Sequence, residues 1–262
     1  MVVDLLQVFL SLVSVVGISY VVVMLQRWQS IGPNELQLQF TLAKDTAMFA
    51  CHLGFMHALQ SISSIPDPVF RAAALKKLDT IYEELATLGR GTVVFHSTES
   101  WRLVYEQLLC SKVVYDYKSV AWIRDVNYWQ NEPGQKSLKL CLQLIDAQQL
   151  KMHRIFILSN EMWPESQPLP HPTIVRWVEE HVTHQIPIGL IRESALRLDD
   201  DLLVDMGIYG SHAVGHQLIS EADGTSKFVL QFDFDAVASA EEVWVRLCAY
   251  AKDCKEIREQ PP

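Results

Sequence analysis

Several signatures of common catalytic folds are absent from this sequence. It contains no G-x-G-x-x-G turn, no Walker loop, no G-x-S-x-G elbow and no H-E-x-x-H helix. It also has no run of Lys and Arg, and its net charge is −9 at pH 7. Because nucleic acids bind through clustered positive charge, this composition argues against a nucleic-acid partner. No cofactor is expected, since the usual binding motifs are missing.

Cysteine is scarce and shows no pairing pattern. The five cysteines are widely spaced, with no C-x-x-C pair, and the chain has no Asn-x-Ser/Thr glycosylation triplet. A disulfide framework needs an even number of cysteines at closer spacing, so these residues are expected to be reduced and structural. The composition therefore favours a cytoplasmic location for the folded part of the chain.

Charge is absent from one long stretch near the N-terminus. From Leu5 to Leu25 there are 21 residues without a charged side chain, which make about 31 Å of helix. A secretory signal peptide would carry a positive n-region and a cleavage site, and a buried core helix seldom runs so long without a charge. We therefore predict a single transmembrane helix that contacts the lipid bilayer.

The charges that flank this span predict its orientation. No Lys or Arg precedes it, whereas Arg27 and Lys44 follow it. The positive-inside rule then places the rest of the chain in the cytoplasm. The sequence thus predicts a single-pass protein of the inner (plasma) membrane with a cytoplasmic C-terminal domain.

A helical connector is expected after the span. Asn34 can cap a helix that runs to about Ser61, and Asp67 can cap a second helix. Both carry apolar residues at spacings of three and four. This αα-hairpin can pack on the domain, form a homodimer with its twin, or transmit a signal. The expected parts of the chain are an anchor (1–33), the hairpin (34–90), an α/β domain (91–255) and a disordered tail (256–262).

Strand and helix patterns alternate from Gly91 onward. The expected strands are 92–96, 119–123, 154–158 and 187–192, followed by 202–209, 213–219 and 228–234. The expected helices are 99–110, 134–151, 173–184 and 236–252. Alternation of this kind predicts βαβ crossovers. The fold class is therefore α/β, with a mixed, mostly parallel sheet flanked by helices and preceded by one transmembrane helix and the αα-hairpin.

Histidines and aromatic residues offer few further clues. The pairs His181/His184 and His212/His216 can bind a metal ion with a third ligand, but no carboxylate or cysteine lies at a defining distance, so no metal site is predicted. Most of the aromatic residues between 101 and 129 fall in expected strands and helices. Tyr128 and Trp129 lie in a polar loop, where they are freer to contact a ligand.

Polar residues follow each of the first four expected strands. Open α/β sheets bind ligands at the carboxyl ends of their parallel strands, which meet at one rim. The ligand-binding candidates from these strand ends, with one histidine from a later segment, are His96, Glu99, Asp125, Asn127, Asn160, Glu161, Arg192, Glu193 and His212. Such a mixture can bind a polar or phosphorylated small molecule. The alternative is that these side chains cap helices and satisfy loops.

The successive segments TVVFHSTESWRLVYEQLL, YKSVAWIRDVNYW, HRIFILS, IPIGLIRES and LLVDMGIYGSHAV carry a family resemblance. Over about residues 91–254 the chain resembles a phospholipase D-like domain of the degenerate kind. Active members carry His-x-Lys-x4-Asp, in which His is the nucleophile or acid and Lys binds phosphate. Here Val214 stands in place of that Lys in the segment from Ser211 to His216. The resemblance implies the fold rather than the activity.

These observations predict a membrane-anchored protein whose α/β domain is non-catalytic and either senses a small polar ligand or docks a protein partner. A membrane-tethered hydrolase of phosphodiester or related bonds is the alternative, with His96 or His212 and rim carboxylates as acid and base. A scaffold that acts through the hairpin alone is a third possibility, which would leave the polar rim unused.

Overall fold

The computed structural model describes residues 41–128, 130–219 and 226–253. The chain divides into two compact units, and the boundary between them falls at Ile81 and Tyr82. The expected span from Leu5 to Leu25 and the expected tail 256–262 lie outside the described residues. Within the described ranges, no helix is both long and apolar enough to cross a membrane.

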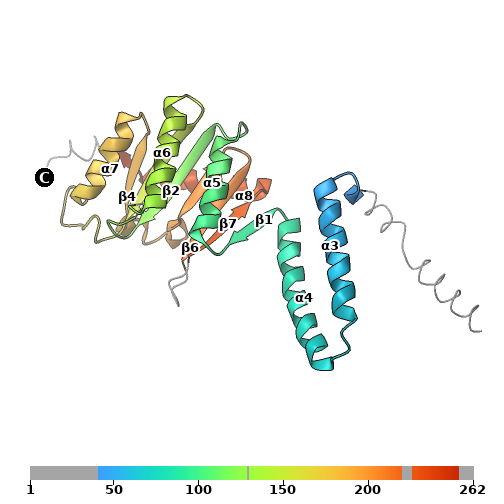
Figure 1. Ribbon diagram of the computed structural model, residues 1–262. Helices are drawn as coiled ribbons and strands as arrows, with labels where there is room; N and C mark the ends of the chain where they lie inside the picture. Colours follow the sequence, from blue (N-terminus) through green and yellow to red (C-terminus); the bar gives the residue numbers. More distant parts are fainter. Residues whose placement is uncertain (1–40, 129, 220–225, 254–262) are drawn as a thin grey trace, which may run out of the picture. The chain divides into compact units, whose positions relative to one another are not determined.

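Two long helices follow the first described residues, and the second of them crosses the boundary between the units. They are α3 (Thr46–Ser63) and α4 (Pro68–Gly89) (Figure 1). Asp67 accepts a hydrogen bond from the Phe70 amide at 2.7 Å, which confirms its predicted role as a cap. The single helix expected from Asn34 to Ser61 is wrong within the described residues, because a turn precedes Asp45, whose carboxylate caps α3.

The C-terminal unit is built on one eight-stranded mixed sheet with the order β1-β7-β6-β5-β2-β3-β4-β8. The first four strands are β1 (Thr92–Phe95), β2 (Asp116–Ile123), β3 (Lys151–Leu158) and β4 (Ile188–Arg192). The last four are β5 (Met206–Tyr209), β6 (Ala213–Ile219), β7 (Ser226–Gln231) and β8 (Lys252–Asp253). A mixed α/β sheet is therefore confirmed.

The expectation of a mostly parallel sheet is wrong. Only β2 with β3 and β3 with β4 pair in parallel, and the other neighbours pair antiparallel. The reason is that β5, β6 and β7 lie between β1 and β2, so the first βαβ crossover does not join neighbouring strands. The pairing still gives β1, β2, β3 and β4 the same direction, and their carboxyl ends share one rim of the sheet.

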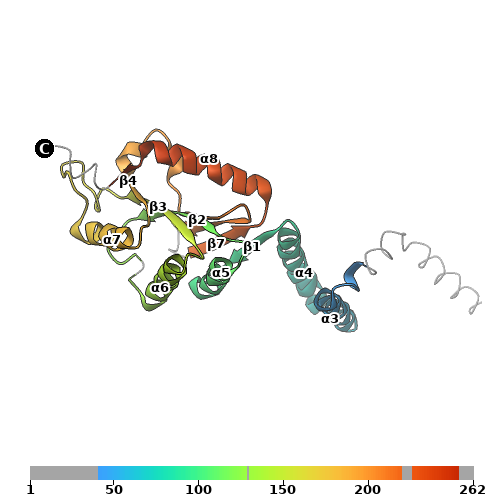
Figure 2. The same ribbon diagram turned by 90° about the horizontal axis from the view of Figure 1, so that it is seen from above.

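Helices cover both faces of this sheet. On one face lie α5 (Thr98–Cys110), α6 (Glu132–Asp146) and α7 (Pro172–Thr183), and on the other lies α8 (Phe234–Tyr250) (Figure 2). Each face has its own apolar core. The first is centred on Phe156 and Leu158, and the second on Ile157 and Val214. Alternate residues of each strand thus belong to opposite cores.

One helix ends earlier than expected. Periodicity predicted a helix from 134 to 151, but α6 ends at Asp146 and β3 begins at Lys151. Gln148 has φ of 57°, in the left-handed region that stops a helix. The chain therefore turns before the alternating residues of β3 begin.

Candidate functional site

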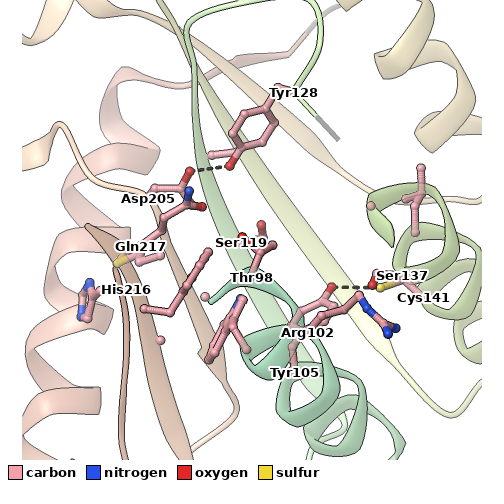
Figure 3. A pocket seen from close by; sticks show the side chains of 18 of the residues that line it. Thr98, Arg102, Tyr105, Ser119, Tyr128, Ser137, Cys141, Asp205, His216 and Gln217 are labelled. Atoms are coloured by element: carbon pink, nitrogen blue, oxygen red, sulfur yellow. Dashed lines mark hydrogen bonds between the residues drawn. The ribbon is translucent and has the colours of Figure 1, made fainter. Parts of the chain in front are cut away.

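A pocket of about 410 Å³ lies between the sheet and helices α5 and α6 (Figure 3). This volume is within the range that proteins use for small molecules. Side chains from α5, α6, the loop after β2 and strands β2, β3, β5, β6 and β7 contribute to its wall. The site therefore lies on the face of the sheet and extends to the rim where β2 ends.

Small residues on the sheet let the aromatic wall of the pocket pack closely against it. Gly207 on β5 pairs with Ser119 on β2 and with Gly215 on β6, so three neighbouring strands place almost no side-chain volume in one row. A Cβ atom at Gly215 would lie 2.7 Å from the Trp101 ring, and one at Gly207 would lie 3.0 Å from the Tyr117 ring. The two glycines therefore leave the space that these aromatic side chains fill.

Arg154 supplies a buried positive charge to the pocket. It lies on β3, is 7% exposed and lines the pocket wall. Its Nη1 is 2.9 Å from Nε2 of His181, whose Nδ1 is 2.7 Å from the Trp177 carbonyl oxygen. A carbonyl only accepts hydrogen bonds, so the ring proton is on Nδ1 and Nε2 accepts from Arg154. Burial, and then the Arg154 charge, lower the pKa of His181 to about 3, which keeps this ring neutral.

Asp205 brings a carboxyl group to the same pocket. The Tyr128 hydroxyl donates a hydrogen bond to its Oδ2, and this pair links the residue before β5 to the loop after β2 (Figure 3). Burial raises the pKa of Asp205 to about 6, although the Tyr128 hydrogen bond and the charge of Arg154 act in the opposite direction. This carboxyl group therefore changes its charge near neutral pH.

Three phenols lie close together beside the glycine row. Tyr117 and Tyr209 stack with ring centroids 5.0 Å apart, and Tyr105 meets Tyr117 edge-on at 5.9 Å. The Tyr105 hydroxyl is 3.1 Å from Sγ of Cys141 (Figure 3). Burial raises the pKa of all three phenols. They stay protonated at neutral pH and keep hydrogen atoms to donate.

Arg102 on α5 lines the outer part of the pocket. Its guanidinium donates to Oε1 of Glu106 at 2.6 Å and to Oε1 of Glu99 at 2.5 Å. Glu106 also accepts from the Ser137 hydroxyl on α6 at 2.8 Å, so this network ties the two helices together. The Arg102 charge is thus balanced by carboxylates on its own helix.

The structure brings two of the nine predicted site residues to this pocket. Asp125 and Asn127 line it, and Asp125 accepts a hydrogen bond from the Asn127 amide at 2.7 Å. Tyr128, expected to be freer to contact a ligand, lines it as well, while Trp129 lies outside the described residues. The other seven predicted residues do not line this pocket, although several of them lie at the same rim.

Those seven residues occupy different surroundings. His96 is exposed between β1 and α5, and Glu99 is paired with Arg102. Asn160 and Glu161 are exposed in the loop after β3, and Glu193 begins a short 3-10 turn, Glu193–Leu196.

Two of the seven have identifiable partners away from the pocket. The Arg192 Cζ lies 4.4 Å from the centroid of the Trp163 ring, and the guanidinium donates to two carbonyl oxygens in the loop after β3. Arg192 therefore holds this loop in place. His212 lies in the β5–β6 turn and contacts Phe232, at 5.5 Å between ring centroids. This turn lies at the end of the sheet opposite the shared rim, because β5 runs antiparallel to β2. His96 and His212 are therefore not brought together.

The remaining histidine near the pocket faces the other way. His216 follows Gly215, whose Cβ position points at Trp101, so the His216 side chain points to the opposite face, where Val214 packs in the α8 core. His184 is 3.1 Å from Asp146 rather than beside a second ligand. Within the described ranges, no group of three or more His, Cys, Asp or Glu side chains is placed to hold a metal ion.

Sequence reasoning missed Arg154 and Asp205. One signal for Arg154 was visible, because a charged residue in the apolar segment MHRIFIL has to be satisfied inside the protein. Asp205 carried no comparable signal, since a carboxylate just before a strand is usual at a turn.

No protein-family model and no curated protein matches this chain. Several solved structures match it in fold comparisons. Nuc, a phospholipase D family member from Salmonella typhimurium, matches with a TM-score of 0.42 and 12% identity over 62% of this chain and 96% of that chain. NucT from Helicobacter pylori matches with a TM-score of 0.41 and 9% identity over 62% and 98%.

TrmBL2, an archaeal chromatin protein, matches with a TM-score of 0.36 and 14% identity over 76% of this chain and 68% of that chain. The phospholipase D-like fold expected from the sequence recurs among these matches. Identities and TM-scores this low say nothing of activity.

Proposed function

We propose that the α/β domain binds a small organic anion in the pocket between α5, α6 and the sheet, and that it does not cleave this ligand. The observation that carries the proposal is Arg154, a buried guanidinium that lines a hollow of ligand size. A guanidinium recognises carboxylate or phosphate oxygens through charge-assisted hydrogen bonds. The sequence-based hypothesis of a ligand-sensing domain thereby acquires a specific site.

The neighbours of Arg154 support an anionic and partly aromatic ligand. The protonated phenols and the Ser119 hydroxyl offer hydrogen-bond donors, which an anion needs. Trp101 and Phe228, stacked at 5.5 Å, give the wall a flat apolar part. An aromatic or heterocyclic ring that carries one carboxylate or phosphate group suits both kinds of surface.

The side chains that face the pocket also support binding without cleavage. The hydrolase hypothesis required His96 or His212 to act with rim carboxylates, and neither residue lines the pocket. Among the described residues, His216 is the one histidine and no lysine is among those that line it. With the His216 ring on the α8 face, a histidine nucleophile of the kind that active phospholipase D-like enzymes use has no counterpart here.

The ligand proposal predicts selective, pH-dependent binding by the full chain purified in detergent. At millimolar concentration, phenyl phosphate or benzoate should raise the melting temperature, and neutral benzyl alcohol should not. Affinity for benzoate, which is mostly a monoanion at both pH values, should fall about 3- to 10-fold between pH 5 and pH 7, because Asp205, whose pKa is about 6, gains a negative charge over this range. Calorimetric titration of the wild type and of Asp205→Asn, which stays neutral at both pH values, measures this change.

Two results would contradict the proposal. If benzyl alcohol raised the melting temperature as much as the anions do, Arg154 would not recognise the negative charge of the ligand. Release of nitrophenolate from bis(p-nitrophenyl) phosphate by the wild type, lost in Arg154→Met, would replace binding by hydrolysis.

The membrane anchor remains a proposal that rests on residues 5–25. Their apolar length predicts that the full chain stays with the membrane fraction after carbonate washing, and that a chain without residues 1–33 is released. Protease added to intact cells should spare the α/β domain, because we place it in the cytoplasm. Digestion of this domain from outside would reverse the orientation.

A further inference from the structure

Helix α3 carries no charge and buries nothing. Its 18 residues include no Asp, Glu, Lys or Arg, and none of them is buried. Five large apolar side chains of α3 remain exposed, at Met48 (52%), Leu53 (44%), Phe55 (47%), Met56 (53%) and Leu59 (42%). A helix of this composition is stable in water only when another surface covers it.

The apolar residues of α3 occupy one side of the helix. At 100° per residue, Phe49, Met56 and Leu59 belong to an arc of about half the circumference. Small and polar residues such as Gly54 and His57 fill the remaining side, and His52, Gln60 and Ser63 lie among the apolar residues. We call the apolar side the α3 face, which consists of Met48, Phe49, Leu53, Phe55, Met56, Leu59 and Ile62.

Helix α4 has a similar but narrower apolar arc, which charged residues border on both sides. The α4 face consists of Phe70, Ala74, Leu78, Ile81, Leu85 and Leu88. The opposite arc carries Lys76, Asp79 and Glu83, and Arg71, Lys77 and Glu84 flank the α4 face. No residue of α4 is buried either. One arc thus suits a protein interface and the other suits water.

The exposed apolar area is large enough for a stable interface. Nine large apolar side chains of the α3 and α4 faces are 38–53% exposed. At roughly 200 Å² for a fully exposed side chain of this size, they present on the order of 800 Å². A standard interface buries about 800 Å² on each partner.

We propose that two copies of this chain pair through the α3 and α4 faces and form a four-helix bundle. In a two-fold dimer the same patch meets itself, so any charged residue near the axis would meet its own charge. Because α3 has no Asp, Glu, Lys or Arg along its full length, it avoids this repulsion. We therefore place α3 at the centre of the dimer, next to the two-fold axis. The charged arc of α4 then remains in water on the outside.

The charge pattern favours a second copy over the bilayer surface. Helices that lie in the membrane interface carry Lys and Arg on their polar side. The polar side of α3 has neither, and α4 carries three carboxylates and three basic side chains, so it has no excess of positive charge. Neither α3 nor α4 is long and apolar enough to cross the membrane.

Measurement of the mass of the full chain tests this proposal. Light scattering of the purified protein in detergent, corrected for bound detergent, should give two chains per particle at micromolar concentration. Met56→Glu should weaken this dimer at least 100-fold, because it buries a carboxylate in the apolar centre. His57→Glu adds the same charge one residue away on the polar side and should leave the dimer intact.

A second pair of variants repeats the comparison on α4. Ile81→Glu lies on the α4 face and should dissociate the dimer, whereas Thr80→Glu lies on the charged arc and should not. Far-UV circular dichroism shows whether each variant keeps its helices. A monomeric wild type would overturn the proposal and assign the two faces to the bilayer or to another segment of the same chain. Equal dissociation by Met56→Glu and His57→Glu would overturn it as well.

Discussion

Arg154→Met is expected to weaken binding of an organic anion more than 100-fold while leaving the α/β domain folded. The guanidinium is the buried charge that faces the pocket from β3, and removal of one partner from a buried charged contact costs about 2–5 kcal/mol of binding free energy. Methionine retains most of the side-chain volume. Titration calorimetry with phenyl phosphate and a thermal melt of the same samples separate the two effects.

The loss of stability in Arg154→Met should be small for a physical reason. His181 loses the hydrogen-bond donor to its Nε2, which costs about 1–3 kcal/mol of folding free energy. This cost is offset in part because the variant does not have to remove a charged guanidinium from water when it folds. Without the nearby charge the pKa of His181 should rise above its value of about 3, which an NMR pH titration detects.

Arg192→Met is the matched control for this variant. Arg154 lies 5.3 Å from the centroid of the Phe156 ring, and Arg192 likewise lies over an aromatic ring and donates to protein groups, but Arg192 does not line the pocket. It should lower the melting temperature through the loop after β3 and leave ligand affinity unchanged. If Arg192→Met weakens binding as much as Arg154→Met does, the pocket is not the binding site.

Gly215→Ala and Gly189→Ala are each expected to lower the free energy of unfolding by about 1–3 kcal/mol, as overpacked sites do. A Cβ atom would lie 2.7 Å from the Trp101 ring at Gly215, and 2.7 Å from the Ala251 Cβ at Gly189. Only Gly215→Ala should also weaken ligand binding, about tenfold or more, because Trp101 belongs to the pocket wall. Urea unfolding and calorimetry on both variants measure these quantities.

Gly54→Ala is expected to raise the free energy of unfolding rather than lower it. Nothing lies within 4 Å of a Cβ atom at this helical position, so alanine should stabilise α3 by about 0.5–1 kcal/mol. A stabilising effect of Gly215→Ala would show that Trp101 can move at no cost. In that case the position of Trp101 in the pocket wall would not depend on the glycine.

The sequence predicted where strands and helices occur better than it predicted which strands pair with one another. The strand expected at 213–219 has the bounds of β6, and each of the other expected strands overlaps an observed one. Alternation of strand and helix indicates that the chain makes crossover connections between strands. It does not indicate which strands are neighbours in the sheet. The insertion of β5, β6 and β7 between β1 and β2 was therefore invisible, as was β8, which has two residues.

Prediction of the candidate site succeeded at the end of β2 and in the polar loop that follows it, where Tyr128 also lines the pocket. Asp125 and Asn127 follow β2 directly, so the rule for carboxyl ends found them. The rest of the pocket lies on the face of the sheet. Its aromatic wall packs where side-chain volume is missing at Gly207 and Gly215, and these positions become neighbours only when β2, β5 and β6 pair in one register.

The sheet order also has a consequence for synthesis of the chain. Strand β1 pairs with β7, where Thr92 lies opposite Gln231, so β1 leaves the ribosome long before its partner exists. At about 5–20 residues per second this delay lasts many seconds. During it, β1 has no strand of its own sheet to pair with, and α5 has no β7 to pack on. The wall that α5 gives the pocket is therefore completed late, when most of the domain has already emerged.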